Sequence, residues 1–312
     1  MSPLPCISVI IPLYNKAAHV RRCVYSIQAQ SLRDFEVVVV DDGSTDSSFE
    51  DFRRATADDR RFRILRQANG GVSRARNAGI AECRANWVAF LDADDEWAPG
   101  FLRSILDVIE QSPDAVVVGT AFKVIQDEKR ELVRQARFAT NASVGITEFF
   151  QSWDQLGNCP LFIGASAAKR SELRAIGGFM PGMSLGEELL VFIRLLDRGN
   201  LAYGSDPLAT YHLSAGGSLS TSPSAAALRS HTPLLLELAR QVKLGHCPRS
   251  VYRKWLDMQA DYLIHQGMRA DLLKLIWSEP ANWSGKFWVR VALEMIGVRS
   301  RMSRVLGRPR PG

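Results

Sequence analysis

Short apolar runs alternate with amphipathic segments along the first 120 residues of the chain. Continuous apolar runs of this kind predict buried strands, and they occur at residues 6–12, 35–40, 62–65, 87–91 and 115–120. Between them, apolar residues recur at the spacing of a helix, beginning with the set Val20, Cys23, Val24 and Ile27. Further helices are expected from about Ser47, Ser73 and Pro99. Repeated strand–helix units predict an α/β fold, in which a mostly parallel central sheet is covered by helices on both faces.

Polar loops follow the first, second and fourth predicted strands, with the sequences PLYNK, DDGSTD and DADDE. In such sheets ligands bind beyond the carboxyl ends of the strands, where the connecting loops gather. The sequence therefore predicts a ligand site built by these loops. For DDGSTD alone, an ordinary strand-to-helix loop with a good N-cap is the alternative.

The second half of the chain is less regular. Residues 121–160 include a charged stretch at 126–137, for which we expect a solvated hairpin or a loop. An apolar run from Leu161 follows, with helices near 171–176 and 187–198. The Gly-, Ser- and Pro-rich stretch 216–226 marks a loop or boundary. We therefore predict an α/β domain at 1–222 and a helical region at 223–312, with helices within 224–243, 251–267 and 286–306.

The composition is that of a soluble globular protein, with 46% hydrophobic and 23% charged residues. A formal charge of +6 indicates an anionic partner, which could be nucleic acid, acidic lipid or a phosphorylated small molecule. Five cysteines without a close pair indicate neither a zinc site nor a disulfide framework, and a cytoplasmic location is expected. No apolar run reaches the roughly 18 to 20 residues of a spanning helix, so a soluble or peripheral protein is predicted.

The stretch AFLDADDEW ends an apolar run with closely spaced carboxylates, which are Asp92, Asp94, Asp95 and Glu96. Their mutual repulsion is destabilising unless a positive charge lies among them. The sequence alone leaves open what neutralises these carboxylates.

A further motif, NGGVSRARNAG at residues 69–79, places Ser73 as an expected helix N-cap, with Arg74 and Arg76 in the first turn. Cations at a helix N-terminus oppose the macrodipole, which favours a facing anion such as a diphosphate. The alternative is a merely solvated pair of arginines.

The strings SVIIPLYNK, VDDGSTDSS, NGGVSRARNAG, FLDADDEW and GGF occur in this order between residues 6 and 220. As an ordered set they resemble the family 2 glycosyltransferases, whose nucleotide-diphospho-sugar transferase fold is called GT-A. The resemblance is to bacterial-type, non-processive members, because the membrane spans and the Q-x-x-R-W motif of processive synthases do not appear.

The resemblance implies a divalent metal at Asp92-Ala93-Asp94, which matches the family's D-x-D motif. Asp94 is the preferred direct ligand, ahead of Asp92. Oxygen ligands suit Mg²⁺ or Mn²⁺, and a metal held partly by substrate phosphates needs only one or two protein carboxylates. A cation that arrives with the substrate would then relieve the repulsion. The alternative, compatible with the first, is that Asp94 or Asp95 caps the helix near Pro99.

By the same matching, the nucleotide contacts Pro12, Tyr14, Asn15, Asp42, Asn69, Arg76, Asp92 and Ala93. Asp42 would accept a hydrogen bond from the base, which for uracil is the imide N–H, and Arg76 would approach the phosphates or the base. For Tyr14, packing under the loop is the alternative.

The resemblance also implies a catalytic base after the GGF turn, where the family carries an acidic pair that opens a helix. Here the pair is Glu187 and Glu188. Glu188 stands in place of the usual aspartate, and its reach differs by roughly 1.5 Å, a displacement that can cost about a hundredfold in rate. The alternative is that both glutamates simply favour a helix N-terminus. His212 matches a third metal or phosphate contact, with a structural histidine as the alternative.

The leading hypothesis is an inverting, metal-dependent hexosyltransferase. It would move one sugar from a UDP-linked donor to a glycan or lipid-linked saccharide in surface polysaccharide biosynthesis. One alternative is a sugar nucleotidyltransferase, although such enzymes place a Gly-rich loop and a Lys after the first strand, where this chain has PLYNK. A nucleic-acid-binding protein is the other, although the basic residues are dispersed and no nucleic-acid module is present; no nucleic-acid partner is expected.

The last predicted helix combines apolar residues such as Phe287 and Trp288 with a basic face and tail. Such a segment can lie on an anionic membrane, which gives peripheral contact with the inner face of the cell membrane. Packing on the catalytic domain, or a homodimer contact, explains the apolar residues equally well.

Overall fold

The computed structural model describes residues 4–126, 130–136, 138, 143–183, 186–213 and 232–265. The chain divides into two compact units, Met1–Glu237 and Leu238–Gly312. The predicted boundary at residue 222 lies outside the described residues.

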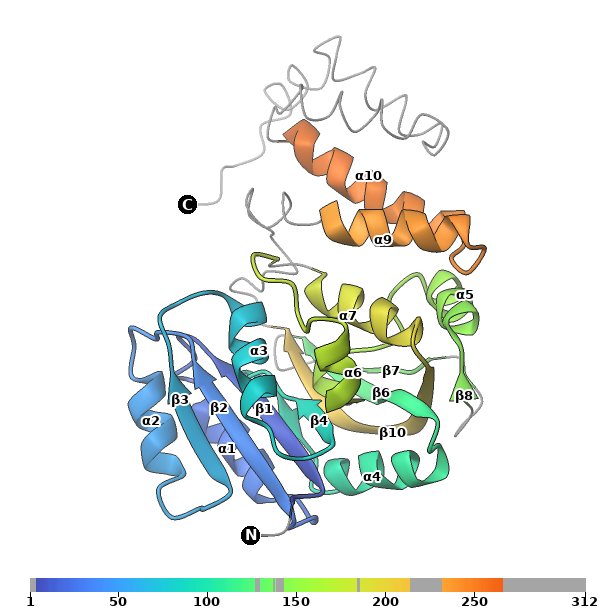
Figure 1. Cartoon of the computed structure of the whole chain (residues 1–312). Helices are drawn as coiled ribbons and strands as arrows, with labels where there is room; N and C mark the ends of the chain where they lie inside the picture. The colour runs from blue at the N-terminus through green and yellow to red at the C-terminus, as the bar shows by residue number, and fades with distance from the viewer. Residues whose placement is uncertain are drawn as a thin grey trace. The chain divides into compact units, whose positions relative to one another are not determined.

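Four parallel strands form the first half of the central sheet, in the order β3-β2-β1-β4 (Figure 1). Their bounds are Ile7–Leu13 for β1, Phe35–Asp41 for β2, Phe62–Arg66 for β3 and Trp87–Phe90 for β4. The helices that alternate with them are α1 (Val20–Gln28), α2 (Ser48–Ala55), α3 (Val72–Glu82) and α4 (Phe101–Gln111). These strands and helices confirm the strand–helix alternation that the hydrophobic pattern predicts.

The second half of the sheet is mixed, so the expected mostly parallel order holds only for the first half. β9 (Ser166–Lys169) is antiparallel to both of its neighbours, β4 and β6 (Ala115–Gln126). Beyond β6 the sheet continues with β10 (Asn200–Leu213), which is parallel to β6, and β5 (Glu96–Trp97), which is antiparallel to β10. The short β8 (Ser143–Val144) also pairs with β10.

Within the charged stretch at 126–137, residues 130–134 form a strand, which agrees with the hairpin, one of the two predicted forms. β7 (Arg130–Arg134) pairs antiparallel with β6, from Phe122 opposite Arg134 to Gln126 opposite Arg130. A helix that the pattern does not predict, α5 (Ile146–Leu156), follows. The remaining helices of the described residues are η1 (Ile163–Ala165), α6 (Arg170–Ala175), α7 (Glu187–Leu196), α9 (Thr232–Lys243) and α10 (Arg249–His265).

The central strands are buried on both faces. Val9 and Ile11 of β1 belong to the apolar cluster that includes the α1 residues Val24 and Ile27. Ile10 points to the opposite face, against α3, because side chains alternate along a strand. A Cβ on Gly79 of α3 would lie 2.6 Å from the Ile10 side chain, so a glycine is required for this close helix–sheet contact.

All five cysteines are free thiols. In the described part of the chain, no helix is long and apolar enough to cross a membrane. The predicted helix at 286–306 and its basic tail lie outside the described residues, and with them the expected membrane or dimer contacts.

Candidate active site

The loops that follow β1 and β2 are joined by Asn15. Its backbone has a φ of 49°, and its side-chain oxygen accepts a hydrogen bond from the Thr45 N–H at 2.9 Å. The Asn15 N–H in turn donates to the Ser44 hydroxyl at 3.1 Å. The structure thus brings PLYNK and DDGSTD together at the carboxyl edge of the sheet, where the sequence predicts a ligand site. Tyr14, 45% exposed, does not pack under the loop.

Asp42 organises the glycine-rich loop between β3 and α3. Its carboxylate, only 3% exposed, accepts hydrogen bonds from the Gln67 side chain at 2.7 Å and from the backbone N–H groups of Gly70 and Gly71 at 2.9 and 2.7 Å. Asn69 lies exposed in this loop. Sequence analysis did not foresee that Asp42 anchors backbone amides, and its contact with a base stays a prediction.

Side chains of the protein itself offset the repulsion among the acidic residues that follow β4. Lys16 Nζ lies 2.5 Å from Asp94 Oδ2, and Arg76 Nη2 lies 2.8 Å from Asp92 Oδ1. The Arg22 guanidinium donates to the Asp94 carbonyl. A cation arriving with the substrate is therefore not the sole means of neutralising this loop.

Asp95 differs from its neighbours because it is buried, with 1% exposure. Burial and the nearby charges of Asp94 and Asp92 raise its pKa well above the ordinary value, which favours the neutral acid. One carboxyl oxygen of Asp95 accepts a hydrogen bond from the His212 N–H at 3.0 Å. Asp95 thus ties the end of β10 to the acidic loop.

The His212 ring lies beside the acidic loop, where it contacts Glu96. The distance from His212 Nε2 to Glu96 Oε1 is 2.8 Å. The imidazole is only 14% exposed. The structure shows the contact of His212 with Glu96. A metal or phosphate contact by His212 stays a prediction.

Two expected helix caps are wrong. The N-cap of α4 is Gly100 and has no side-chain capping hydrogen bond, so neither Asp94 nor Asp95 caps this helix. The N-cap of α3 is Gly71, with a φ of 87°. Ser73 lies inside the helix, where its hydroxyl donates to the Met183 carbonyl at 3.4 Å. The glycines, which tolerate positive φ, begin α3 earlier than the serine signal suggests.

The donor set at the D-x-D motif fits a hard divalent cation. The side chains of Asp92 and Asp94 are 27% and 25% exposed, on either side of the buried Ala93. No group of three His, Cys, Asp or Glu residues in the described ranges is arranged to hold a metal unaided. Two accessible carboxylates suffice where substrate phosphates complete the coordination.

The acidic pair predicted to provide the base opens α7, behind Gly186 at a φ of 77°. Glu187 is 6% exposed and accepts a hydrogen bond from Arg76 Nη1 at 3.0 Å. Burial and the negative charge of Glu187 raise the pKa of Glu188 well above its ordinary value, while Arg76 opposes the shift. Arg76 is itself only 2% exposed, so it is not a solvated arginine.

The Asn77 side chain joins two of the sequence motifs. Its amide nitrogen donates to the Phe179 carbonyl at 2.7 Å, and its oxygen accepts from the Phe179 N–H at 2.8 Å. These two bonds hold the GGF turn against α3. The turn contains Gly177 and Gly178 at φ of 81° and 67°, a conformation that favours glycine.

Replacing Asn77 with Ala should lower the free energy of unfolding by about 1 to 3 kcal/mol, because the Phe179 N–H and carbonyl lose their partners. Urea denaturation with a tryptophan fluorescence readout measures the effect. Asn158→Ala, at an exposed loop position, is the matched control, with an expected change of less than about 0.5 kcal/mol. Equal stability of the two variants would contradict this role for Asn77.

The motifs that the sequence singles out therefore lie at one edge of the sheet, joined by specific contacts. The family model described as glycosyl transferase family 2 matches residues 8–175, more than half of the chain. The chain belongs to this family. The resemblance on which the sequence analysis relies is thereby confirmed.

Relatives of the chain match over shorter stretches. The uncharacterised glycosyltransferase EpsJ of Bacillus subtilis (strain 168) is 34% identical over 130 residues, which are 42% of this chain and 38% of that protein. Chondroitin synthase of Escherichia coli is 33% identical over 125 residues, 40% of this chain and 18% of the synthase. The chain thus aligns with well under half the length of these relatives.

Among solved structures, S. aureus TarS 1-349 in complex with UDP-GlcNAc shares the fold at a TM-score of 0.63 and 17% identity. The match covers 82% of this chain and 71% of that one. The predicted GT-A fold is confirmed by this likeness.

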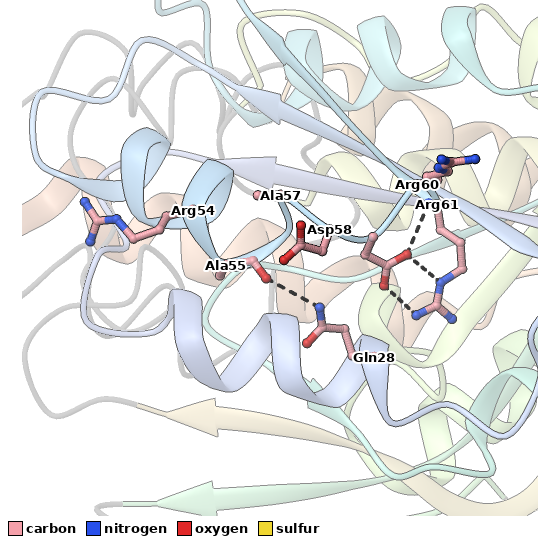
Figure 2. A pocket seen from close by; sticks show the side chains of 8 residues that line it. Gln28, Arg54, Ala55, Ala57, Asp58, Arg60 and Arg61 are labelled. Atoms are coloured by element: carbon pink, nitrogen blue, oxygen red, sulfur yellow. Dashed lines mark hydrogen bonds and ion pairs between the residues drawn. The ribbon is translucent and has the colours of Figure 1, made fainter.

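A hollow of about 480 Å³ lies at the opposite, amino edge of the sheet, between the end of α1 and the loop before β3 (Figure 2). Its lining is polar and includes the bidentate pair of Arg61 and Asp59, with a closest distance of 2.6 Å. None of the predicted site residues lines this hollow.

Proposed function

We propose that the chain is an inverting glycosyltransferase that moves one sugar from a UDP-sugar to a hydroxyl of a glycan or lipid-linked acceptor. The observation that carries this proposal is the bridge through Arg76 between the acidic loop and the helix that begins with Glu187 and Glu188. A donor site and a candidate base thereby face one region at the carboxyl edge of the sheet. The UDP-GlcNAc bound in the TarS structure supports a UDP-linked donor.

In this proposal Glu188 takes the proton from the acceptor hydroxyl. The acceptor oxygen then bonds to the anomeric carbon from the face opposite the leaving group, the bond to the β-phosphate oxygen breaks, and UDP leaves with that electron pair. A raised pKa suits a general base, because proton transfer is most effective when the pKa lies near the working pH. Asp94 and Asp92 would hold Mg²⁺ or Mn²⁺, which supplies positive charge to the departing diphosphate.

The relatives support a role in polysaccharide synthesis, since one of them is a chondroitin synthase. We propose residues 1–222 as the catalytic domain and the cytoplasm as the location. The two alternatives, a sugar nucleotidyltransferase and a nucleic-acid-binding protein, lose their support because glycosyl transferase family 2 matches residues 8–175 of the chain.

The rate of transfer should fall as the pH is lowered through a value above the ordinary glutamate pKa of about 4.3. The reason is that protonated Glu188 cannot accept the acceptor proton, and its pKa is raised by burial and by Glu187. Initial rates under saturating substrates across the pH range measure this acid limb. A transfer rate that stays constant as the pH is lowered into the range where an ordinary glutamate titrates would exclude Glu188 as the base.

A panel of nucleotide sugars tests the proposed function. The protein is incubated with each donor, with Mn²⁺ or with EDTA, and released nucleotide and transferred sugar are followed by mass spectrometry. We expect metal-dependent release of UDP, increased by a suitable saccharide acceptor. Release of pyrophosphate, or exchange of it into the donor, would indicate a nucleotidyltransferase instead.

A further inference from the structure

Arg76 holds together two elements that lie far apart along the chain. Its Nη1 donates to Glu187, 111 positions away, at 3.0 Å, and its Nη2 donates to Asp92 at 2.8 Å. The side chain is 3% exposed, and its guanidinium carbon lies 5.2 Å from the centre of the Phe179 ring. Both ends of the guanidinium are therefore bound to protein carboxylates.

The planar guanidinium presents its N–H groups in a rigid fork. When the two ends of one fork bind different carboxylates, the distance between those carboxylates is fixed. Arg76 thus sets the spacing between the first turn of α7 and the loop after β4. The neighbouring Asn77 fixes the GGF turn that leads toward α7, so α3 holds this region at two points.

The geometry points to Arg76 as a positioning residue that sets the distance between Glu188 and the Asp92–Asp94 loop, acting through Glu187. This inference rests on the proposed function, in which Glu188 faces the acceptor and the loop faces the donor diphosphate. Arg76 then acts on the rate of transfer without touching the nucleotide. It differs in this from the nucleotide contact that the sequence analysis expected.

The kinetic test compares Arg76→Lys, Arg76→Met and Glu187→Gln with Arg103→Met, an exposed charge deletion on α4. Arg76→Met should lower kcat by about a hundredfold, the scale expected for misplacement by about an ångström. The donor KM and the Kd of UDP at saturating Mn²⁺ should change by less than about threefold, since ground-state binding is kept. Arg76→Lys should recover part of the loss, because an ammonium retains the charge but cannot span both carboxylates.

Coupling with Glu187 distinguishes positioning from general damage. If Arg76 acts through Glu187, the double variant Arg76→Met with Glu187→Gln should be no slower than Arg76→Met alone. Should Arg76→Met fail to fold, Arg76→Lys and Glu187→Gln carry the same test, because neither leaves a buried carboxylate without a cation nearby. Fully additive losses in kcat would overturn the inference.

A measurement that does not depend on activity completes the test. Hydrogen exchange at the α7 amides of Leu190 to Ile193 should quicken by about tenfold or more in Arg76→Met, with exchange in α4 unchanged. Unchanged α7 protection together with weakened UDP binding would show that Arg76 is a nucleotide ligand, and would overturn the inference while the proposed function stands. A wild-type protein that neither binds UDP nor transfers sugar would overturn the proposed function, and with it the effect of Arg76 on the rate, while the exchange experiment would still report whether Arg76 holds α7.

Discussion

Replacing Glu188 with Gln should lower kcat by about 10³-fold, within the range of about 10² to 10⁴ that general bases contribute. The reason is that an amide cannot accept the proton of the acceptor hydroxyl, although it occupies nearly the same volume. The Kd of UDP should change by less than about threefold, because Glu188 does not contact the nucleotide in the proposed mechanism. Single-turnover transfer and calorimetric titration measure the two quantities.

The informative comparison for this variant is Glu188→Asp, which restores the residue that the family usually carries here. A carboxylate one methylene shorter should retain more activity than the amide, despite its different reach. If Glu188→Gln transferred sugar at the wild-type rate, the base would have to lie elsewhere, and Glu187, paired with Arg76 at 3.0 Å, would be the next group to test.

Replacing Asp94 with Ala should reduce transfer by about 10² to 10³-fold, since the loss of a metal that neutralises a leaving diphosphate removes several kcal/mol of stabilisation. It should also abolish the stimulation by Mn²⁺. Asp94 is the residue to change because its carboxylate is partly exposed, at 25%, and is paired only with Lys16, 39% exposed, among the contacts of the described chain. Initial rates against Mn²⁺ concentration measure the effect.

The matched control for this prediction is Glu110→Ala, which removes an exposed carboxylate at the end of α4. It should leave both the rate and the Mn²⁺ dependence unchanged. A variant Asp94→Ala that still responds to Mn²⁺ as the wild type does would show that the metal is held by other groups.

The parallel half of the sheet could be predicted from the sequence because its strands are continuous apolar runs. All of β2, for example, is buried, and its sequence, FEVVVVD, contains the continuous apolar run that predicts a buried strand. β9 could not be predicted, since its sequence SAAK has small side chains and becomes a strand only through pairing with β4 and β6. β5 consists of two residues, defined by its pairing with β10.

The place of the site could be predicted for a similar reason. Loops that follow parallel strands must gather at one edge, so the motifs fix the region without any knowledge of contacts. The contacts themselves depend on distances across the fold. Nothing in the local sequence indicates that Lys16 faces Asp94, that Asn77 binds the GGF turn, or that Arg76 bridges to α7.

The expected helix caps show the limit of local signals. A serine or aspartate near a helix start is a common cap, yet α3 and α4 begin at glycines with no side-chain capping bond. The acidic loop after β4 is instead held by cations from α3 and from the region of α1, including Arg76 and Arg22. Burial and pairing across the fold thus override the local preference.

The most direct test of the account is calorimetric titration of the wild-type protein with UDP, in Mn²⁺ and again in EDTA. The account predicts one binding site per chain in Mn²⁺ and an affinity at least about tenfold weaker in EDTA, because the diphosphate then faces Asp92 and Asp94 without the metal between them. Absence of UDP binding in both conditions would contradict the assignment of a UDP-sugar donor to this edge of the sheet.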